Sequence, residues 1–78
     1  MKKHIVVITC DDIRSEIETA VAEAEEESQI NFPSDESRIE FIEDCTDCVS
    51  DKYDAYEHYR PDYRATVLDT ARIYGYQL

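Results

Sequence analysis

Apolar side chains in the first third of the chain recur at intervals of three and four residues, the period of an amphipathic α-helix. The apolar face of this predicted helix consists of Ile13, Ile17, Val21 and Ala24. Asp11 or Asp12 is suited to its N-cap, and we expect the helix to fade near Ser28. Before it, the β-branched run from His4 to Thr9 predicts a short strand.

A longer helix is predicted over residues 34–59. Its first turn carries the N-terminal signals Ser34 and Ser37, and Glu40 follows Ser37 by three residues. Its apolar stripe comprises Ile39, Ile42, Cys45, Val49, Tyr53 and Tyr56, and is widened by Phe41, Cys48 and Tyr59. We expect this helix to lie centrally, covered by the other helices.

A third helix is predicted between Pro61, which suits a first turn, and Gly75, which suits a C-terminal cap. Its inner face consists of Tyr63, Val67, Ala71 and Tyr74. The single strand needs a pairing partner, which residues 30–32, the tail 76–78 or a second copy of the chain could supply. We therefore predict a mainly α fold, one small domain over residues 1–78 with three helices and a short N-terminal β-strand. An α+β fold with a small sheet is the alternative.

The composition is strongly acidic: the 78 residues include 19 Asp and Glu against eight Lys and Arg, a net charge of −11. Binding to a phosphate backbone needs a surplus of cations, so the composition disfavours direct nucleic-acid binding. The longest apolar run, residues 5–8, is too short for a membrane helix or a signal peptide. Three cysteines, an odd number, argue against a secreted disulfide framework. We therefore expect a cytoplasmic protein without a membrane partner.

Most of the negative charge lies in residues 11–57, where 17 acidic residues face three basic ones, a segment charge of −14. One row of acids follows the second predicted helix at spacings of three and four: Glu36, Glu40, Glu43, Asp47, Asp51 and Asp54. The row covers about 27 Å at the helical rise, and its like-charge neighbours destabilise the helix by about 1–2.5 kcal/mol in all. On the first helix, the acids that could extend this surface are Glu16, Glu23, Glu26 and Glu27.

Two interpretations of this acidic row are open. A solvated helix face is the simpler one, but such faces usually interleave lysine with glutamate. A row kept uniformly negative at a cost in stability favours a surface selected for its electrostatic field. Four tyrosines gather near one end of the row, either as core packing or as anchors for a partner: Tyr53, Tyr56, Tyr59 and Tyr63.

The remaining chemistry-bearing residues give weaker signals. Cys45 and Cys48 form a C-x-x-C pair within a predicted helix, and we interpret them as buried or half-buried thiols. A zinc site would need two further ligands, and the candidates are Cys10, His4 and His58. The sequence contains no phosphate-binding glycine loop and no recognisable set of nucleophile, base and orienting group. We therefore expect no enzyme activity, no metal and no cofactor.

Small size, strong acidity, helical periodicity and acidic helix rows together resemble the phage-encoded inhibitors that imitate DNA, such as the Ocr-type antirestriction proteins and acidic anti-CRISPR proteins. The tetrapeptides Asp11–Arg14 and Ala71–Tyr74 are similar to short pieces of the Ocr-type protein in the same order, and cover 8 of the 78 residues. This chain is shorter than that type and its C-terminal end is not acidic. The resemblance implies a non-enzymatic inhibitor that blocks the basic nucleic-acid-binding surface of a restriction enzyme, a CRISPR effector or another host protein. The oligomeric state is open between a monomer and a dimer paired through the strand, and a charge of −11 per chain opposes self-association.

A small regulatory adaptor is the alternative function. It would bind a protein partner through apolar surface, or by adding the N-terminal strand to the partner's sheet. Such binding would survive high salt, and proline at Ile5 or Val7 would abolish strand addition because it removes a backbone donor. A thiol- or metal-dependent module built on the three cysteines is a third possibility, which native mass spectrometry would test.

Overall fold

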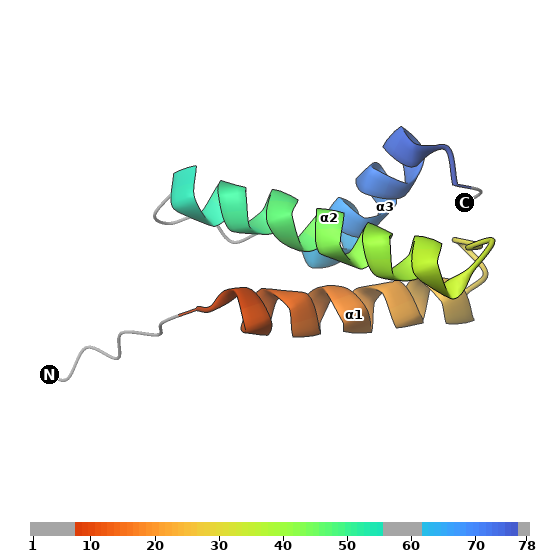
Figure 1. Ribbon diagram of the computed structural model, residues 1–78, viewed down its shortest axis with the longest axis horizontal. Helices are drawn as coiled ribbons and strands as arrows, with labels where there is room; N and C mark the ends of the chain where they lie inside the picture. The colour runs from red at the N-terminus through yellow and green to blue at the C-terminus, as the bar shows by residue number, and fades with distance from the viewer. Residues whose placement is uncertain (1–7, 56–61, 77–78) are drawn as a thin grey trace, which may run out of the picture.

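The computed structural model describes residues 8–55 and 62–76, with Asp54 and Ala55 described by their backbone alone. This part of the chain forms three α-helices: α1 (Cys10–Glu26), α2 (Asp35–Ala55) and α3 (Tyr63–Tyr74) (Figure 1). The prediction of a mainly α fold is therefore confirmed, and within the described ranges there is no strand. The predicted strand lies outside the described residues except for Ile8 and Thr9, which are not in a strand.

Helix α1 begins two or three residues earlier than the sequence predicts. Thr9 is its N-cap: the Thr9 hydroxyl accepts a hydrogen bond from the Asp12 backbone N–H at 3.2 Å, and the Asp12 carboxylate accepts one from the Thr9 N–H at 3.0 Å. The prediction of Asp11 or Asp12 as N-cap is wrong, because Asp12 is the N3 partner of this capping box. The hydrogen bonds from Thr9 to the Asp12 carboxylate lower the pKa of that carboxyl group.

The first connection of the fold is tight. Helix α1 ends at Glu26, and Ser28 two residues later has a φ of 59°, in the left-handed region. The Gln29 N–H then bonds back to the Ala24 carbonyl at 2.9 Å. Ile30 then turns inward and is 1% exposed. Ser34 opens α2, as predicted, because its hydroxyl accepts a hydrogen bond from the Ser37 N–H at 3.2 Å.

Helix α3 is closed at both ends by caps. The Asp62 carboxylate accepts a hydrogen bond from the Ala65 N–H at 3.2 Å, and Gly75 adopts a left-handed φ of 76°, which confirms its predicted cap role. The Tyr76 N–H bonds back to the Ala71 carbonyl at 3.0 Å. Pro61 and the predicted end of the second helix lie outside the described residues.

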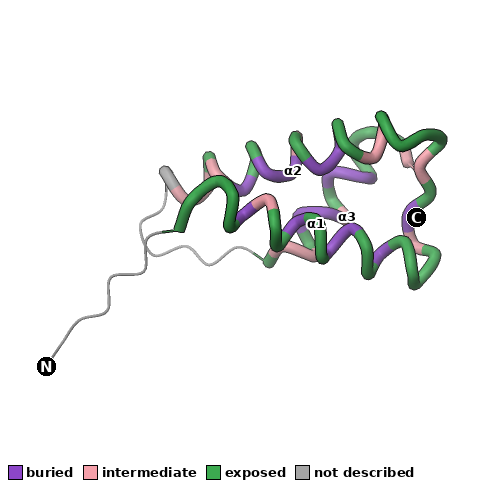
Figure 2. The backbone as a smooth tube through the Cα atoms, turned by 60° about the horizontal axis from the view of Figure 1, so that its bottom comes forward, coloured by how far each residue is buried: buried purple, intermediate pink, exposed green. Residues whose placement is uncertain are grey.

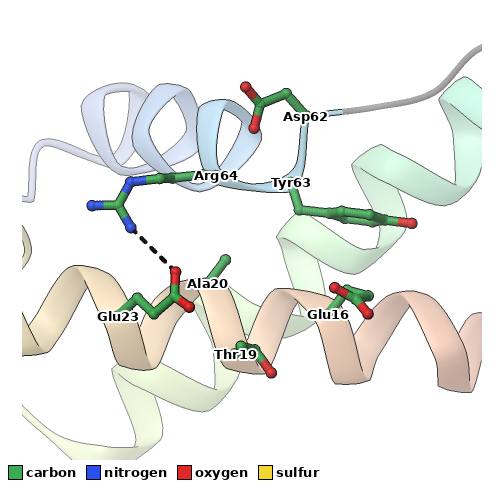
Figure 3. Close-up of a pocket in the computed structure, with 7 residues that line it drawn as sticks. All are labelled: Glu16, Thr19, Ala20, Glu23, Asp62, Tyr63 and Arg64. Atoms are coloured by element: carbon green, nitrogen blue, oxygen red, sulfur yellow. Dashed lines mark ion pairs between the residues drawn. The ribbon is translucent and has the colours of Figure 1, made fainter.

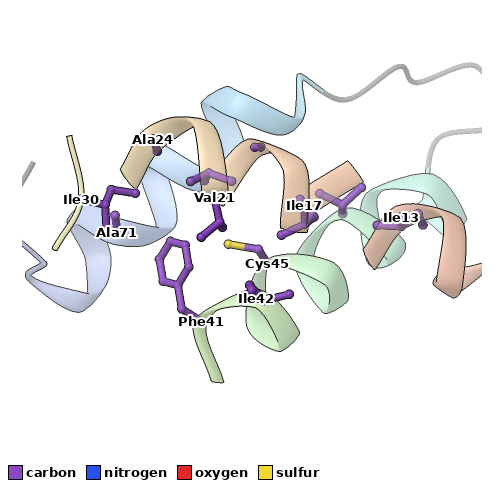
Figure 4. Packing of buried hydrophobic residues seen from close by; sticks show 12 residues of the cluster. Ile13, Ile17, Val21, Ala24, Ile30, Phe41, Ile42, Cys45 and Ala71 are labelled. Atoms are coloured by element: carbon purple, nitrogen blue, oxygen red, sulfur yellow. The ribbon is translucent and has the colours of Figure 1, made fainter. Parts of the chain in front are cut away.

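The buried side chains form one cluster to which all three helices contribute (Figure 4). Its members are Ile13, Ile17, Ala20, Val21, Ala24, Ile30, Phe41, Ile42, Cys45, Val49, Val67 and Ala71. The predicted inner face of α1 is thus confirmed. Each helix packs against both others, so α2 is covered by both other helices as expected, but it is no more central than α1. A central helix needs apolar surface on two sides, whereas the side of α2 opposite its core residues carries the acidic row.

Two residues assigned to the apolar side of α2 are exposed instead. Ile39 is 48% exposed, and Cys48 is also exposed. Each stands three residues from a buried neighbour, Ile42 or Cys45, and is rotated by about 60° from it, which places the two residues just beyond opposite edges of the buried arc. On α3, Tyr74 is similarly 45% exposed, although its ring contacts the core.

Three threonines are buried although they are polar: Thr46, Thr66 and Thr70. The Thr46 hydroxyl donates to the Ile42 carbonyl at 2.7 Å, and the Thr66 hydroxyl donates to the Asp62 carbonyl at 3.1 Å. Thr46 and Thr66 thus satisfy their hydroxyls locally, which removes most of the penalty of burying them.

An aromatic cluster joins the loop before α2 to the end of α3. Phe41 of α2 is fully buried, and its ring centroid lies 5.1 Å from that of Phe32 and 5.5 Å from that of Tyr76. Tyr74 completes the cluster at 6.0 Å from Phe41, and its hydroxyl donates to the Asp44 carboxylate. These edge-on contacts fix α3 against the N-terminal half of α2.

Candidate functional site

The acidic row lies on the outer face of α2. Figure 2 shows the exposed positions along one edge of this helix and the buried positions along the other. The described side chains of the row are all exposed: Glu36, Glu40, Glu43, Asp47 and Asp51. Asp54 continues the row in the helical backbone, but its side chain lies outside the described residues. Burial of Phe41, Cys45 and Val49 on the opposite side orients the row toward solvent.

Most of this row has no cation beside it. Glu43 is the exception, because Arg14 of α1 reaches it with an N–O distance of 3.8 Å. Both side chains are about half exposed, so this pair contributes less than about 1 kcal/mol. Glu36, Glu40, Asp47 and Asp51 form no ion pair with any described residue. Among the ion pairs of the described residues, the contact from Arg14 is therefore the one that reaches the row.

The acids of α1 face a different side of the molecule. Arg64 of α3 lies 3.6 Å from Glu23 and also pairs with Glu27. Glu16 lies on the same side, next to Tyr63 (Figure 3). These acids therefore face α3, whereas the α2 row points away from both other helices. The structure does not bring them together with the row, and it neutralises two of them in part.

Other α1 acids are either paired or isolated. Glu25 accepts a hydrogen bond from Arg38 of α2, and Glu18 lies 3.3 Å from Arg14 in its own helix. Glu26 is exposed and forms no ion pair with a described residue. Sequence reasoning missed the roles of Arg14 and Arg64, because cross-helix ion pairs depend on how the helices are placed and leave no signal in the spacing of one segment.

A shallow hollow lies between α1 and the start of α3 (Figure 3). Its volume is about 280 Å³, and its lining consists of Glu16, Thr19, Ala20, Glu23, Asp62, Tyr63 and Arg64. Arg64 crosses it to pair with α1, and it also donates to the Gln29 side chain at 3.3 Å. The charged groups of the hollow therefore hold α3 against α1.

Two of the four tyrosines near the row are described, and they contact each other. The hydroxyl oxygens of Tyr53 and Tyr63 lie 3.3 Å apart, and both residues are half-buried against the core. Desolvation and the hydrogen bond with Tyr53 raise the pKa of Tyr63 to about 12. This geometry favours the packing interpretation for the pair. Tyr56 and Tyr59 lie outside the described residues.

The three cysteines occupy different environments. Cys45 is fully buried, and burial raises the pKa of its thiol to about 11, which holds it in the unreactive neutral form. Cys10 and Cys48 are exposed, and the Cys10 sulfur lies 3.7 Å from the Ser50 hydroxyl. The buried-thiol interpretation thus holds for Cys45 and is wrong for Cys48. Among the residues that the structure describes, no three His, Cys, Asp or Glu side chains are grouped to hold a metal ion.

Comparisons with known proteins give no relative from which a function could be transferred. A scan against protein-family models found no match, and searches of curated proteins and of solved structures found none either. None of the helices in the described ranges is long and apolar enough to cross a membrane.

Proposed function

We propose that this protein is a non-enzymatic inhibitor that imitates DNA and blocks the basic nucleic-acid-binding groove of a bacterial defence protein. A CRISPR effector or a restriction enzyme is the target class, and a phage is the expected source. The observation that carries this proposal is the outer face of α2, where four exposed carboxylates lack any cation among the described residues. Such a surface fits a groove lined with Lys and Arg, and it would exclude the nucleic acid from that groove.

The geometry of the row suits this role. Carboxylates at helix spacings of three and four stand about 5 Å apart along the axis. Duplex DNA carries one phosphate per about 1.7 Å of axis when both strands are counted, so a single row supplies roughly a third of that density. The row is also held in place, because the buried side chains Phe41, Cys45 and Val49 anchor its helix. A preorganised row loses little conformational entropy on binding.

The arginines of the fold support the same interpretation. Arg14, Arg38 and Arg64 each contact an acid of α1. The fold thus places its described arginine contacts largely on α1 and leaves the α2 row negative. A row that served solubility alone would gain stability from nearby cations, since like charges along a helix repel.

The test replaces three row residues by neutral isosteres, Glu40→Gln, Asp47→Asn and Asp51→Asn. We expect inhibition of target cleavage, measured with purified CRISPR effectors and restriction enzymes, to fall at least 100-fold while the circular dichroism spectrum stays helical. A matched control changes the same amount of charge outside the row, through Asp11→Asn, Glu18→Gln and Asp35→Asn. The control should keep inhibition within a few-fold of the wild type.

Salt and competing DNA provide the second readout. Binding to the target should weaken as salt rises, and DNA should displace the protein. Equal losses of inhibition in the row variant and in the control variant would show that only the net charge of the protein matters. Unchanged, salt-resistant binding in the row variant would contradict the proposal and would favour an adaptor that binds through apolar surface.

A further inference from the structure

The outer face of α3 differs from the rest of the molecular surface. Opposite the buried Thr66, Val67, Thr70 and Ala71, this helix presents Ala65, Leu68, Asp69, Arg72 and Ile73. We refer to these five residues as the α3 face. Ile73 is 80% exposed, the most exposed of the large apolar side chains described, and Leu68 is half-buried. An isoleucine so exposed is unusual on a surface otherwise rich in charge, whereas Leu68 lies about 140° away around the helix and packs against the core.

The α3 face is also electrically neutral, whereas the rest of the described chain is strongly negative. Residues 62–76 contain two acidic and two basic residues, against a charge of −14 over residues 11–57. Asp69 and Arg72 are both exposed, and neither forms an ion pair with a described residue. This face is therefore where a second copy, itself carrying −11, meets the least repulsion.

We propose that two copies of this chain associate through the α3 face, with their α3 helices antiparallel about a two-fold axis. In such an isologous contact the residue numbers of opposing positions have a constant sum. An axis level with the midpoint between positions 70 and 71 sets Asp69 level with Arg72 of the second copy. Because the two-fold axis brings the same edge of the two α3 helices together, Ile73 lies on the same edge of the contact as Ile73 of the second copy, displaced by about 7.5 Å along the helix. The Asp69–Arg72 pairing thus occurs twice, and the two exposed Ile73 side chains flank it on one edge of the contact.

The small side chain of Ala65 lets the two helix backbones approach closely at the edge of this contact. Helix α3 has 12 residues, so the paired segment is about 18 Å long. A contact of this length is smaller than a standard stable interface, and the dimer is therefore weak and reversible. Both acidic rows remain exposed in it, because the α2 row faces away from α3.

Salt affects this contact in the opposite direction from target binding. The two copies repel each other through their net charge, and screening removes this repulsion. Dimerisation should therefore strengthen when the salt concentration rises from about 0.05 M to about 0.5 M. This test is independent of the proposed inhibitor function, since it requires no target.

The experiment is sedimentation velocity of the full chain at about 0.5 M salt, over protein concentrations from about 10 µM to 1 mM. The wild type should show a concentration-dependent dimer. Asp69→Arg sets arginine against arginine, and Arg72→Asp sets aspartate against aspartate, so each variant alone should raise the dissociation constant at least tenfold. Asp69→Arg should weaken the dimer although it reduces the net negative charge of each copy. Overall repulsion between the copies therefore could not explain its effect.

Mixing the two variants provides the decisive test. In a mixed dimer each arginine of one chain faces an aspartate of the other, so an equimolar mixture should dimerise about as strongly as the wild type. The control Asp11→Arg changes the charge by the same amount away from α3 and should not weaken the dimer. Ile73→Ser, which alters an exposed side chain and leaves the fold intact, should also weaken it. A wild type that stays monomeric to 1 mM, or a mixture that stays monomeric, would overturn the proposal.

Discussion

Ser28 occupies a backbone conformation that favours glycine, and replacing it should stabilise the fold. Helices α1 and α3 end in the same way: a residue with positive φ is followed by one whose N–H bonds back five residues, from Gln29 to Ala24 and from Tyr76 to Ala71. This residue is Gly75 in α3 but Ser28 in α1, at a φ of 59°. A side chain in the left-handed region costs about 1–2 kcal/mol per residue. Glycine avoids that strain but loses about 0.5–1 kcal/mol through the greater freedom of the unfolded chain.

The net expectation for Ser28→Gly is therefore a gain of about 0.5–1 kcal/mol. For 78 residues the unfolding entropy is about 0.16 kcal/mol/K, so the melting temperature should rise by roughly 3–6 °C. Ser28 is exposed and donates no side-chain hydrogen bond among the described residues, so glycine removes no contact there. Thermal unfolding followed by circular dichroism at 222 nm measures the shift.

Gly75→Ala is the matched reverse experiment. A Cβ at this position meets no atom within 4 Å, so the change tests backbone strain without a steric clash. At a φ of 76° we expect a loss of about 1 kcal/mol, and a melting temperature lower by about 6 °C. An unchanged or lower melting temperature for Ser28→Gly, together with a normal loss for Gly75→Ala, would refute the reasoning about the end of α1.

Three further predictions concern the core. Phe41→Ala removes the fully buried ring at the centre of the aromatic cluster, and it should lower the free energy of unfolding in urea by about 3–5 kcal/mol. Tyr74→Phe keeps the ring of a partly exposed residue and should lower it by less than about 1.5 kcal/mol. Cys45 should resist a thiol reagent at pH 8 until the protein unfolds, while Cys10 and Cys48 react at once; three fast thiols would contradict its burial. The pKa of the Cys45 thiol is about 11 in the folded protein, against an ordinary value of 9.0. The neutral thiol therefore makes its full contribution to the free energy of unfolding below pH 9, and this contribution falls as the pH rises toward 11.

The parts of the fold that follow from local periodicity could be predicted from the sequence. Ile13, Ile17 and Val21 lie on the buried face of α1 because helical spacing alone decides which side is apolar. Gly75 was predictable as a cap because its residue type suits the left-handed conformation. The sequence misplaces the N-cap because Thr9 is also the last residue of the β-branched run before α1. Only its hydrogen bonds with Asp12 show that Thr9 caps the helix and does not end a strand.

Features that depend on the packing of different helices were not predictable. Thr70 is buried because it faces Cys45 of another helix, to whose sulfur it provides a hydrogen bond, and residue polarity alone would place it outside. The pairing of Arg64 with α1 likewise follows from the crossing of α1 and α3. The α2 row was found because it lies on one helix, whereas its proposed extension onto α1 depended on a relative orientation that the sequence does not contain.

The placement of charge connects the two proposed surfaces. A helix that carries a uniform row of carboxylates is less stable than one with interleaved cations, yet the described arginines of this fold contact mainly the acids of α1. The α2 row is thus left to act on a cationic partner, while the neutral α3 face allows two negative molecules to meet. Salt weakens the first interaction and strengthens the second. At low salt the protein should therefore bind its target as a monomer, and a salt titration that followed both equilibria would separate the two surfaces without any mutation.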